Sequence, residues 1–209
     1  MQEALLFSFE EEAQVVCGLD EAGRGPLAGP VVAAAVILSP DFPTHLLDDS
    51  KKLSEKHRLE AEIAIKEKAL YWAIGIATAK EIDRINILQA SLLAMQRAYE
   101  KISSKVHVDV ALVDGNQRPN LDCATRAIVG GDALVPQIMA ASILAKNQRD
   151  RYMVLCHHKW PLYKFEKHKG YPTSEHRDAC LLYGLCPIHR RSFHIEQKQN
   201  KVQKQATLF

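Results

Sequence analysis

Several short apolar runs along this chain end in acidic residues. Residues 15–19 are apolar or glycine and continue directly into Asp20 and Glu21, and a second run covers residues 30–38. Short apolar runs bounded by glycine or proline are typical of buried strands. We therefore predict strands over residues 15–21 and 30–38, joined by a glycine-containing loop in a hairpin-like connection.

Three further strands are predicted downstream. Residues 70–77 and 123–129 are largely apolar, and residues 106–112 alternate between apolar and polar side chains. Asp114 continues the apolar side of the alternating strand, and Asp132 follows the last run after two glycines. Acids therefore stand at three predicted strand ends, where side chains can leave the core and converge on a ligand.

Helical patterns fill most of the segments between these strands. One helix is predicted from the N-cap residue Ser54 to about residue 68, and another, with a core-facing apolar stripe, from Asn86. An alanine-rich helix with proline in its first turn is predicted over residues 136–155. A last helix is expected between the N-cap Thr173 and the stop residue Gly184.

The 209 residues, 47% of them apolar, suffice for one domain with a substantial core. We assign it to residues 14–193, between a frayed segment over 1–13 and a flexible basic tail over 194–209. The longest apolar stretch is too short to span a bilayer, and the acidic start of the chain is unlike a signal peptide. A cytoplasmic, monomeric protein without membrane contact is therefore predicted.

The five cysteines are scattered through apolar segments, and their odd number favours reduced core thiols over a disulfide framework. Zinc binding is an alternative use, because four residues of suitable type lie near one another in the sequence. They are His176, Cys180, Cys186 and His189. Their spacing matches no common zinc motif, so the sequence alone favours reduced thiols.

The net charge of +2 does not by itself indicate a nucleic-acid partner. Its distribution is more informative, because lysines are interleaved with Trp160, Tyr163 and Phe165, and the segment after His189, which begins with Arg190, is rich in basic residues. Basic and aromatic side chains together suit a sugar-phosphate surface. A solvated basic face explains each run equally well.

The four acids Asp20, Glu21, Asp114 and Asp132 define the candidate chemistry. Carboxylates that crowd together repel one another unless divalent cations neutralise them. Ligand sets made only of oxygen favour Mg²⁺ or Mn²⁺. Two such ions can activate a water and stabilise the leaving oxygen of a phosphodiester, so the predicted reaction is metal-dependent phosphodiester hydrolysis.

Further residues are candidates for substrate contact. The loop Gly23-Arg24-Gly25 offers main-chain N–H groups and a guanidinium, which suit phosphate, and its position before a strand argues against a dinucleotide-binding fingerprint. The other candidates are the polar or cationic Lys51, Ser142 and Lys146, and the aromatic ring of Tyr171. The helical stripe formed by Ser142, Lys146 and Arg149 is equally typical of an exposed helix edge.

Five motifs together carry a resemblance to a known family. They are Asp-Glu-Ala-Gly-Arg-Gly at 20–25, Asp-Ser-Lys-Lys-Leu at 49–53, Val-Asp-Gly at 113–115, Ala-Ala-Ser-Ile-Leu-Ala-Lys at 140–146 and Lys-Gly-Tyr-Pro-Thr at 169–173. In their order and spacing the chain resembles bacterial ribonuclease HII. The resemblance implies an α/β, RNase H-like fold: a mixed five-stranded sheet flanked by helices, with a helical C-terminal part.

The resemblance also implies roles for the candidate residues. The four acids match the family's ligands for two Mn²⁺ or Mg²⁺ ions, the 23–25 loop matches its grip on the nucleic-acid backbone, and Tyr171 matches the ring that packs on the sugar at an RNA-to-DNA junction. The implied enzyme hydrolyses the RNA strand of RNA–DNA hybrids. It also cuts on the 5′ side of single ribonucleotides in duplex DNA, leaving 5′-phosphate and 3′-OH ends, and so removes misincorporated ribonucleotides and primer RNA.

Two positions depart from the family pattern, and the C-terminus adds a separate motif. Gly130 stands where lysine is expected, and Asn147 replaces an expected apolar residue. The last residues resemble a short peptide that binds the bacterial sliding clamp through Gln205, Leu208 and Phe209.

Two other functions stay open on the sequence alone. One is an RNase H-like nuclease without selectivity for ribonucleotides. The other is a nucleic-acid-binding module with a structural metal, which would bind without cleaving. Acids at strand ends fit the second poorly, because carboxylates repel phosphate unless metals intervene.

Overall fold

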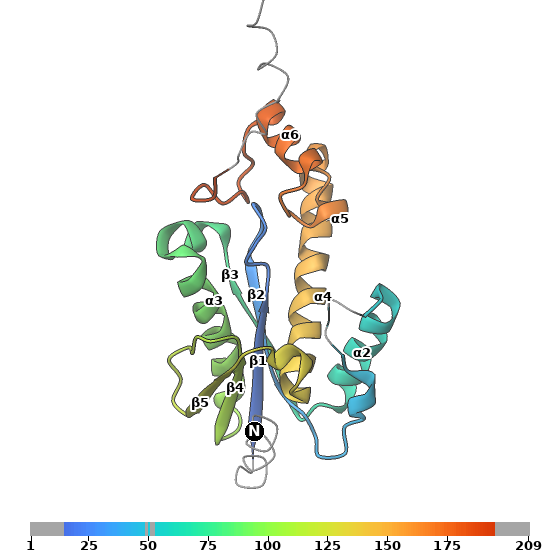
Figure 1. Ribbon diagram of the computed structural model, residues 1–209, viewed down its shortest axis with the longest axis vertical. Coiled ribbons are helices and arrows are strands. Elements are labelled where there is room, and N and C mark those ends of the chain that lie inside the picture. Colours follow the sequence, from blue (N-terminus) through green and yellow to red (C-terminus); the bar gives the residue numbers. More distant parts are fainter. Residues whose placement is uncertain (1–14, 49, 51–52, 195–209) are drawn as a thin grey trace, which may run out of the picture.

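The computed structural model describes residues 15–48, 50 and 53–194, so the predictions for residues 1–13, Lys51 and the C-terminal peptide lie outside the described residues. A five-stranded sheet lies between helices, and further helices follow it near the end of the chain (Figure 1). The strands are β1 (Val16–Ala22), β2 (Val31–Ile37), β3 (Tyr71–Ala77), β4 (Val110–Asp114) and β5 (Ala124–Ile128).

The sheet is mixed, in the order β3-β2-β1-β4-β5. The pair β1–β2 is antiparallel, as its predicted hairpin-like connection requires. The pair β2–β3, which is joined by residues 38–70, is also antiparallel, whereas β1–β4 and β4–β5 are parallel. Parallel strands end at the same edge of a sheet. The carboxyl ends of β1, β4 and β5 therefore meet at one edge, and this edge carries the acids predicted at strand ends.

Helices cover both faces of the sheet (Figure 1). Helix α3 (Ala79–Ser103) packs on one face, and α4 (Pro136–Lys159) with α2 (Glu55–Lys68) on the other. Leu19 of β1 packs in the α3 cluster, so the neighbouring Gly18 and Asp20 face α4. A Cβ at Gly18 would lie 2.2 Å from a backbone atom of Gln137, so glycine is what lets α4 cross β1 so closely.

The predicted helix caps are confirmed. Ser54 accepts a hydrogen bond from the His57 N–H at 3.2 Å and precedes α2, and Thr173 accepts from the His176 N–H at 3.2 Å and precedes α6 (Ser174–Tyr183). Helix α6 ends before Gly184, whose φ of 74° suits a residue without a side chain.

Three element boundaries differ from the sequence prediction by several residues. Helix α3 begins at Ala79, because Thr78 and Glu81 form a capping box, and Asn86 interrupts the helix with a φ of 66° instead of starting it. Strand β4 begins at Val110 rather than at residue 106, because its partner β1 begins at Val16, which is in register with Val110. Helix α4 runs to Lys159, beyond the predicted residue 155.

The C-terminal part packs against the end of α4 around a separate apolar cluster. It consists of η3 (Pro161–Tyr163), α5 (Phe165–His168) and α6. Tyr163 and Phe165 are buried in this cluster with their rings stacked at 5.4 Å, so the proposal that they contact nucleic acid is wrong. No helix in the described ranges is long and apolar enough to cross a membrane.

Candidate active site

Three carboxylates meet at the edge where β1, β4 and β5 end. Asp20, Asp114 and Asp132 each offer an oxygen atom, and these atoms lie within 4.8 Å of one another. Asp20 and Asp132 are buried, with 4% and 8% of their surface exposed, and Asp114 is half-buried. The sequence predicted a group of four acids, and the structure brings three of the four together here.

The sheet register and a short turn bring these acids together. Leu19 of β1 pairs with Val113 of β4, so Asp20 and Asp114 follow at neighbouring strand ends and on the same face. Asp132 lies in η2 (Gly131–Ala133), and its N–H donates to Asp114 Oδ1 at 3.3 Å. A Cβ at Gly131 would lie 2.6 Å from the end of the Ile138 side chain, so glycine lets this turn approach α4 without moving that side chain.

The electrostatics of the cluster favour a bound cation. Burial raises the pKa of Asp20 well above its usual value, and the charges of Glu21 and Asp114 add to the rise. Burial also raises the pKa of Asp114, with a further contribution from Asp132. The Ser142 hydroxyl and the Glu21 N–H oppose the shift at Asp20, and the latter donates to Asp20 Oδ1 at 2.6 Å.

Glu21 lies next to the three aspartates but is not one of the converging group. Strand alternation turns its side chain away from that of Asp20, and Arg24 Nη1 contacts its Oε1 at 3.3 Å. Burial raises the pKa of Glu21, and Arg24 opposes this rise. The negative charge of Asp114 adds to the rise, so Glu21 interacts electrostatically with the cluster. Arg24, with 53% of its side chain exposed, remains accessible to a ligand.

Two buried arginines hold the loop that contains Gly23, Arg24 and Gly25. Arg149 donates to the carbonyls of Ala28 and Pro30, both at 3.1 Å. Arg190 donates to four carbonyls of the same loop. A Cβ at Gly23 would lie 2.1 Å from Arg149 Nε, so this glycine allows the guanidinium to pack beneath the loop. The loop carbonyls are therefore fixed from inside the protein.

Tyr171 lies beside this loop. A Cβ at Gly25 would lie 3.7 Å from its ring, and the Arg149 guanidinium lies 5.9 Å from the ring centroid. The N–H of Leu27 donates to the Gly170 carbonyl at 2.8 Å, which joins the two loops directly. With 42% of its surface exposed, the Tyr171 ring next to Gly25 is accessible to a ligand.

The remaining candidates divide into two groups. Ser142 lies at the cluster, where its hydroxyl also bonds the Ser50 hydroxyl at 2.9 Å, whereas Lys146 pairs with Asp150 at 2.8 Å. The interpretation of the α4 polar stripe as an exposed edge is wrong, because Ser142 and Arg149 are buried. Lys51 lies outside the described residues.

Sequence reasoning missed the role of Arg190. Its place in a basic run suggested a phosphate-binding or solvated surface, but only 1% of its surface is exposed. The local sequence gives no signal for this burial, since its acceptors lie about 160 positions earlier in the chain.

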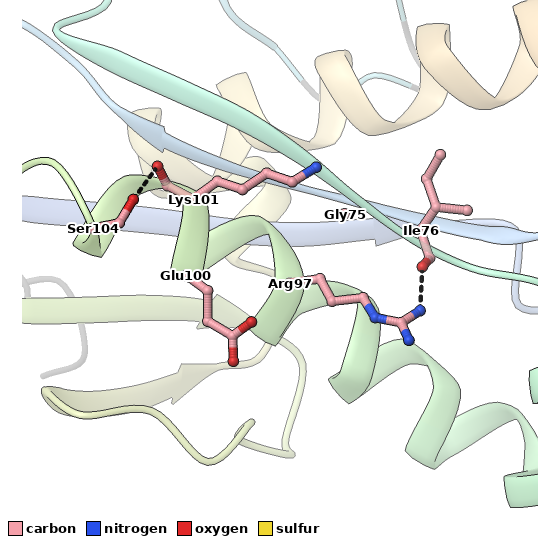
Figure 2. Close-up of a pocket in the computed structure, with 6 residues that line it drawn as sticks. All are labelled: Gly75, Ile76, Arg97, Glu100, Lys101 and Ser104. Atoms are coloured by element: carbon pink, nitrogen blue, oxygen red, sulfur yellow. Dashed lines mark hydrogen bonds between the residues drawn. The ribbon is translucent and has the colours of Figure 1, made fainter.

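A pocket elsewhere on the surface is separate from the acids. It lies between β3 and α3, at the sheet edge opposite β5, and Figure 2 shows that Arg97 reaches across it to the Ile76 carbonyl, at 2.7 Å. Its lining residues are Gly75, Ile76, Arg97, Glu100, Lys101 and Ser104. None of the cluster acids lines it.

The fold places the chain in a class of known structures. The ribonuclease H2 of Pyrococcus horikoshii superposes with a TM-score of 0.68 at 25% identity, covering 87% of this chain and 95% of that one. The ribonuclease HII solved in complex with PCNA from Archaeoglobus fulgidus gives a TM-score of 0.70 at 23% identity, covering 88% and 97%. The fold is therefore of the ribonuclease H type, as predicted.

Sequence comparisons give the family. The model of the family described as ribonuclease HII matches residues 17–196. The ribonuclease HII of Idiomarina loihiensis is 57% identical over 180 residues, which cover 86% of this chain and 95% of that relative. The chain belongs to the ribonuclease HII family and is a ribonuclease H enzyme, which excludes the binding module without activity. Family membership supports hydrolysis of the RNA strand of RNA–DNA hybrids.

Proposed function

We propose that this enzyme hydrolyses phosphodiesters at Asp20, Asp114 and Asp132 with two divalent ions, and that it also cuts on the 5′ side of single ribonucleotides in duplex DNA. The observation that carries the proposal is the convergence of three carboxylates at a largely buried sheet edge. Glu21 is proposed as a fourth acid that assists at the rim of the same site.

The ligand atoms fit hard divalent cations. All are carboxylate oxygens, which suit Mg²⁺ or Mn²⁺ better than softer metals. Burial and mutual repulsion raise the pKa of Asp20 and Asp114, so a bound cation would stabilise their charged forms. When bound, two such ions activate the attacking water and stabilise the leaving oxygen of the phosphodiester. Ser142 and the Glu21 N–H orient Asp20 for this role.

The loop and Tyr171 supply substrate binding. Arg149 and Arg190 hold the loop carbonyls inward, and Arg24 is left accessible on the outside for a phosphate. The Tyr171 ring beside Gly25 is placed to pack on a sugar, where a 2′-OH distinguishes RNA from DNA. Together these groups support recognition of a ribonucleotide next to the acids. The substrate roles of Lys51 and Lys146 stay predictions.

Cleavage of a DNA duplex that contains one ribonucleotide tests the proposal. We expect one cut on the 5′ side of the ribonucleotide with Mg²⁺ or Mn²⁺, no cut with chelator, and no cut of an all-DNA duplex. Tyr171→Ala should reduce the preference for an RNA–DNA junction more than it reduces cleavage inside a long hybrid. An equal rate on the all-DNA duplex would instead favour a nuclease without ribonucleotide selectivity.

A partner and a location complete the proposal. We propose that Gln205, Leu208 and Phe209 bind the sliding clamp, and we note that the Archaeoglobus fulgidus protein was solved with PCNA. Deletion of residues 205–209 should abolish capture by immobilised clamp, and unchanged capture would refute this assignment. The five free cysteines, four of them buried, fit the reducing cytoplasm, and a monomer remains our expectation.

A further inference from the structure

A second group of metal-binding residue types lies outside the acid cluster, in the C-terminal part. Helix α6 supplies His176 and Cys180, which are one helical turn apart, and the segment after the helix supplies His189. All three are buried, with 0%, 5% and 3% of their surface exposed. Their ligand atoms lie within 4.8 Å of one another.

The other two ligand atoms lie close to Nε2 of His189. His189 Nε2 lies 3.0 Å from His176 Nε2 and 3.1 Å from Cys180 Sγ. Atoms that share a zinc ion at bond lengths of about 2.0–2.3 Å lie within about 4 Å of one another, so these separations need little adjustment. The thiol of Cys186 is not in this group, although the sequence placed it beside the other three.

The outward-facing nitrogen of each imidazole already has a backbone partner. His176 Nδ1 lies 2.9 Å from the Tyr171 carbonyl. His189 Nδ1 lies 3.0 Å from the N–H nitrogen of Cys186 and 3.3 Å from its carbonyl oxygen, so either tautomer finds a partner. A metal-binding histidine characteristically donates its other N–H to such a carbonyl, which fixes the ring and directs the free lone pair at the ion.

The protonation states are also suitable. Burial lowers the pKa of His176 and of His189 to about 4, so both rings are neutral at physiological pH, as metal binding requires. Burial raises the pKa of Cys180 to about 11, so the thiol is protonated without a metal. An ion bound there would displace this one proton to solvent.

We propose that His176, Cys180 and His189 form a zinc-binding site with two imidazole nitrogens, one thiolate sulfur and a fourth position open to water. The mixed nitrogen and sulfur ligands select Zn²⁺ over the hard ions favoured by the acid cluster. The site joins α6 to the segment that follows it. Through the hydrogen bond from His176 to the Tyr171 carbonyl, it also ties this segment to the loop beside Gly25.

Cobalt substitution of the full chain tests the site. Untagged protein, stripped with chelator under reducing conditions, is titrated with Co²⁺ and followed by absorption. We expect a saturable cobalt–thiolate charge-transfer band that is lost when Zn²⁺ is added. Co²⁺ bound at the acid cluster contributes no such band, because that cluster offers only oxygen. The experiment therefore reports on this site whether or not the proposed mechanism holds.

Matched variants identify the thiol. Cys180→Ser should abolish the thiolate band, whereas Cys156→Ser, a change at another buried cysteine of the same apolar cluster, should retain it. Asp20→Asn should also retain it. Absence of the band from the wild-type protein would show that the three residues form only a hydrogen-bonded cluster. Persistence of the band in Cys180→Ser would assign the thiolate ligand to another cysteine. Either result would overturn the proposal.

Discussion

Two carboxylates in this protein are equally buried but have opposite surroundings. Asp20 at the end of β1 and Glu62 on α2 each expose 4% of their surface, and both lie against α4. Burial raises the pKa of Asp20, and neighbouring acids raise it further. Burial also acts to raise the pKa of Glu62, but hydrogen bonds, first of all from Arg151, overcome it and lower the pKa to about 2.

The surroundings of Asp20 and Glu62 differ in the source of the positive charge that neutralises the carboxylate. Arg151 donates to both oxygens of Glu62 at 2.7 and 2.8 Å, Lys66 pairs with it at 2.7 Å, and Asn147 donates at 2.8 Å. Asn147, a departure from the family pattern, thus belongs to this network. A buried acid costs free energy unless it is paired. The protein itself supplies the cations that neutralise Glu62, whereas the surroundings of Asp20 favour a cation from solution.

Neutralising Asp20 should separate activity from stability. We expect Asp20→Asn to reduce hybrid cleavage at least about a thousandfold, because a catalytic metal contributes several kcal/mol to the transition state. In chelator, however, the free energy of unfolding should be higher than that of the wild type, because a buried acid among like charges has been removed. Hybrid cleavage in Mn²⁺ and urea unfolding measure the two effects.

The matched control is Glu62→Gln, which should show the reverse pattern. Its activity should be close to wild type, and its unfolding free energy should be lower. If Asp20→Asn kept near-normal cleavage, the assignment of the acid cluster as the catalytic centre would be refuted.

Local sequence patterns predict the surroundings of Asp20 but not those of Glu62. Asp20 and Asp114 follow apolar runs, so the sequence shows that they stand at strand ends, and family motifs assign them a role. Glu62 lies in a helix rich in charged residues, and its partners Asn147 and Arg151 are 85 and 89 positions away. Arg190 was missed for the same reason. Burial that depends on such distant contacts leaves no local periodicity to read.

Acid should weaken the fold through Glu62. The ordinary pKa of this group is 4.5, and in the folded protein it is about 2. The carboxylate therefore contributes stability above pH 4.5, and this contribution is lost as the pH falls from 4.5 towards 2. The shift corresponds to roughly 3 kcal/mol, at 1.36 kcal/mol per pKa unit. Urea unfolding at pH values from roughly 5 down to roughly 2 measures the loss, because Glu62 becomes protonated over this range.

Glu62→Gln sharpens this measurement because it lacks the titrating group. We expect the stability of the variant to depend less steeply on pH than that of the wild type over the same range, with the curves converging at the acid end. Parallel curves would mean that other acids cause the loss and that the Glu62 network is not the source.

Divalent ions should stabilise the wild-type fold by a smaller amount, and this tests the other half of the comparison. An ion that binds only the folded protein adds about 1.4 kcal/mol at a concentration tenfold above its Kd. We expect Mn²⁺ to raise the free energy of unfolding of the wild type and of Glu62→Gln alike, but to have much less effect on Asp20→Asn and Asp114→Asn. Cys180→Ser is included to show that the stabilisation does not come from the C-terminal cluster. Equal stabilisation of the wild type and all four variants would mean that the ion binds outside the acid cluster. The convergence of acids at the sheet edge would then need another explanation.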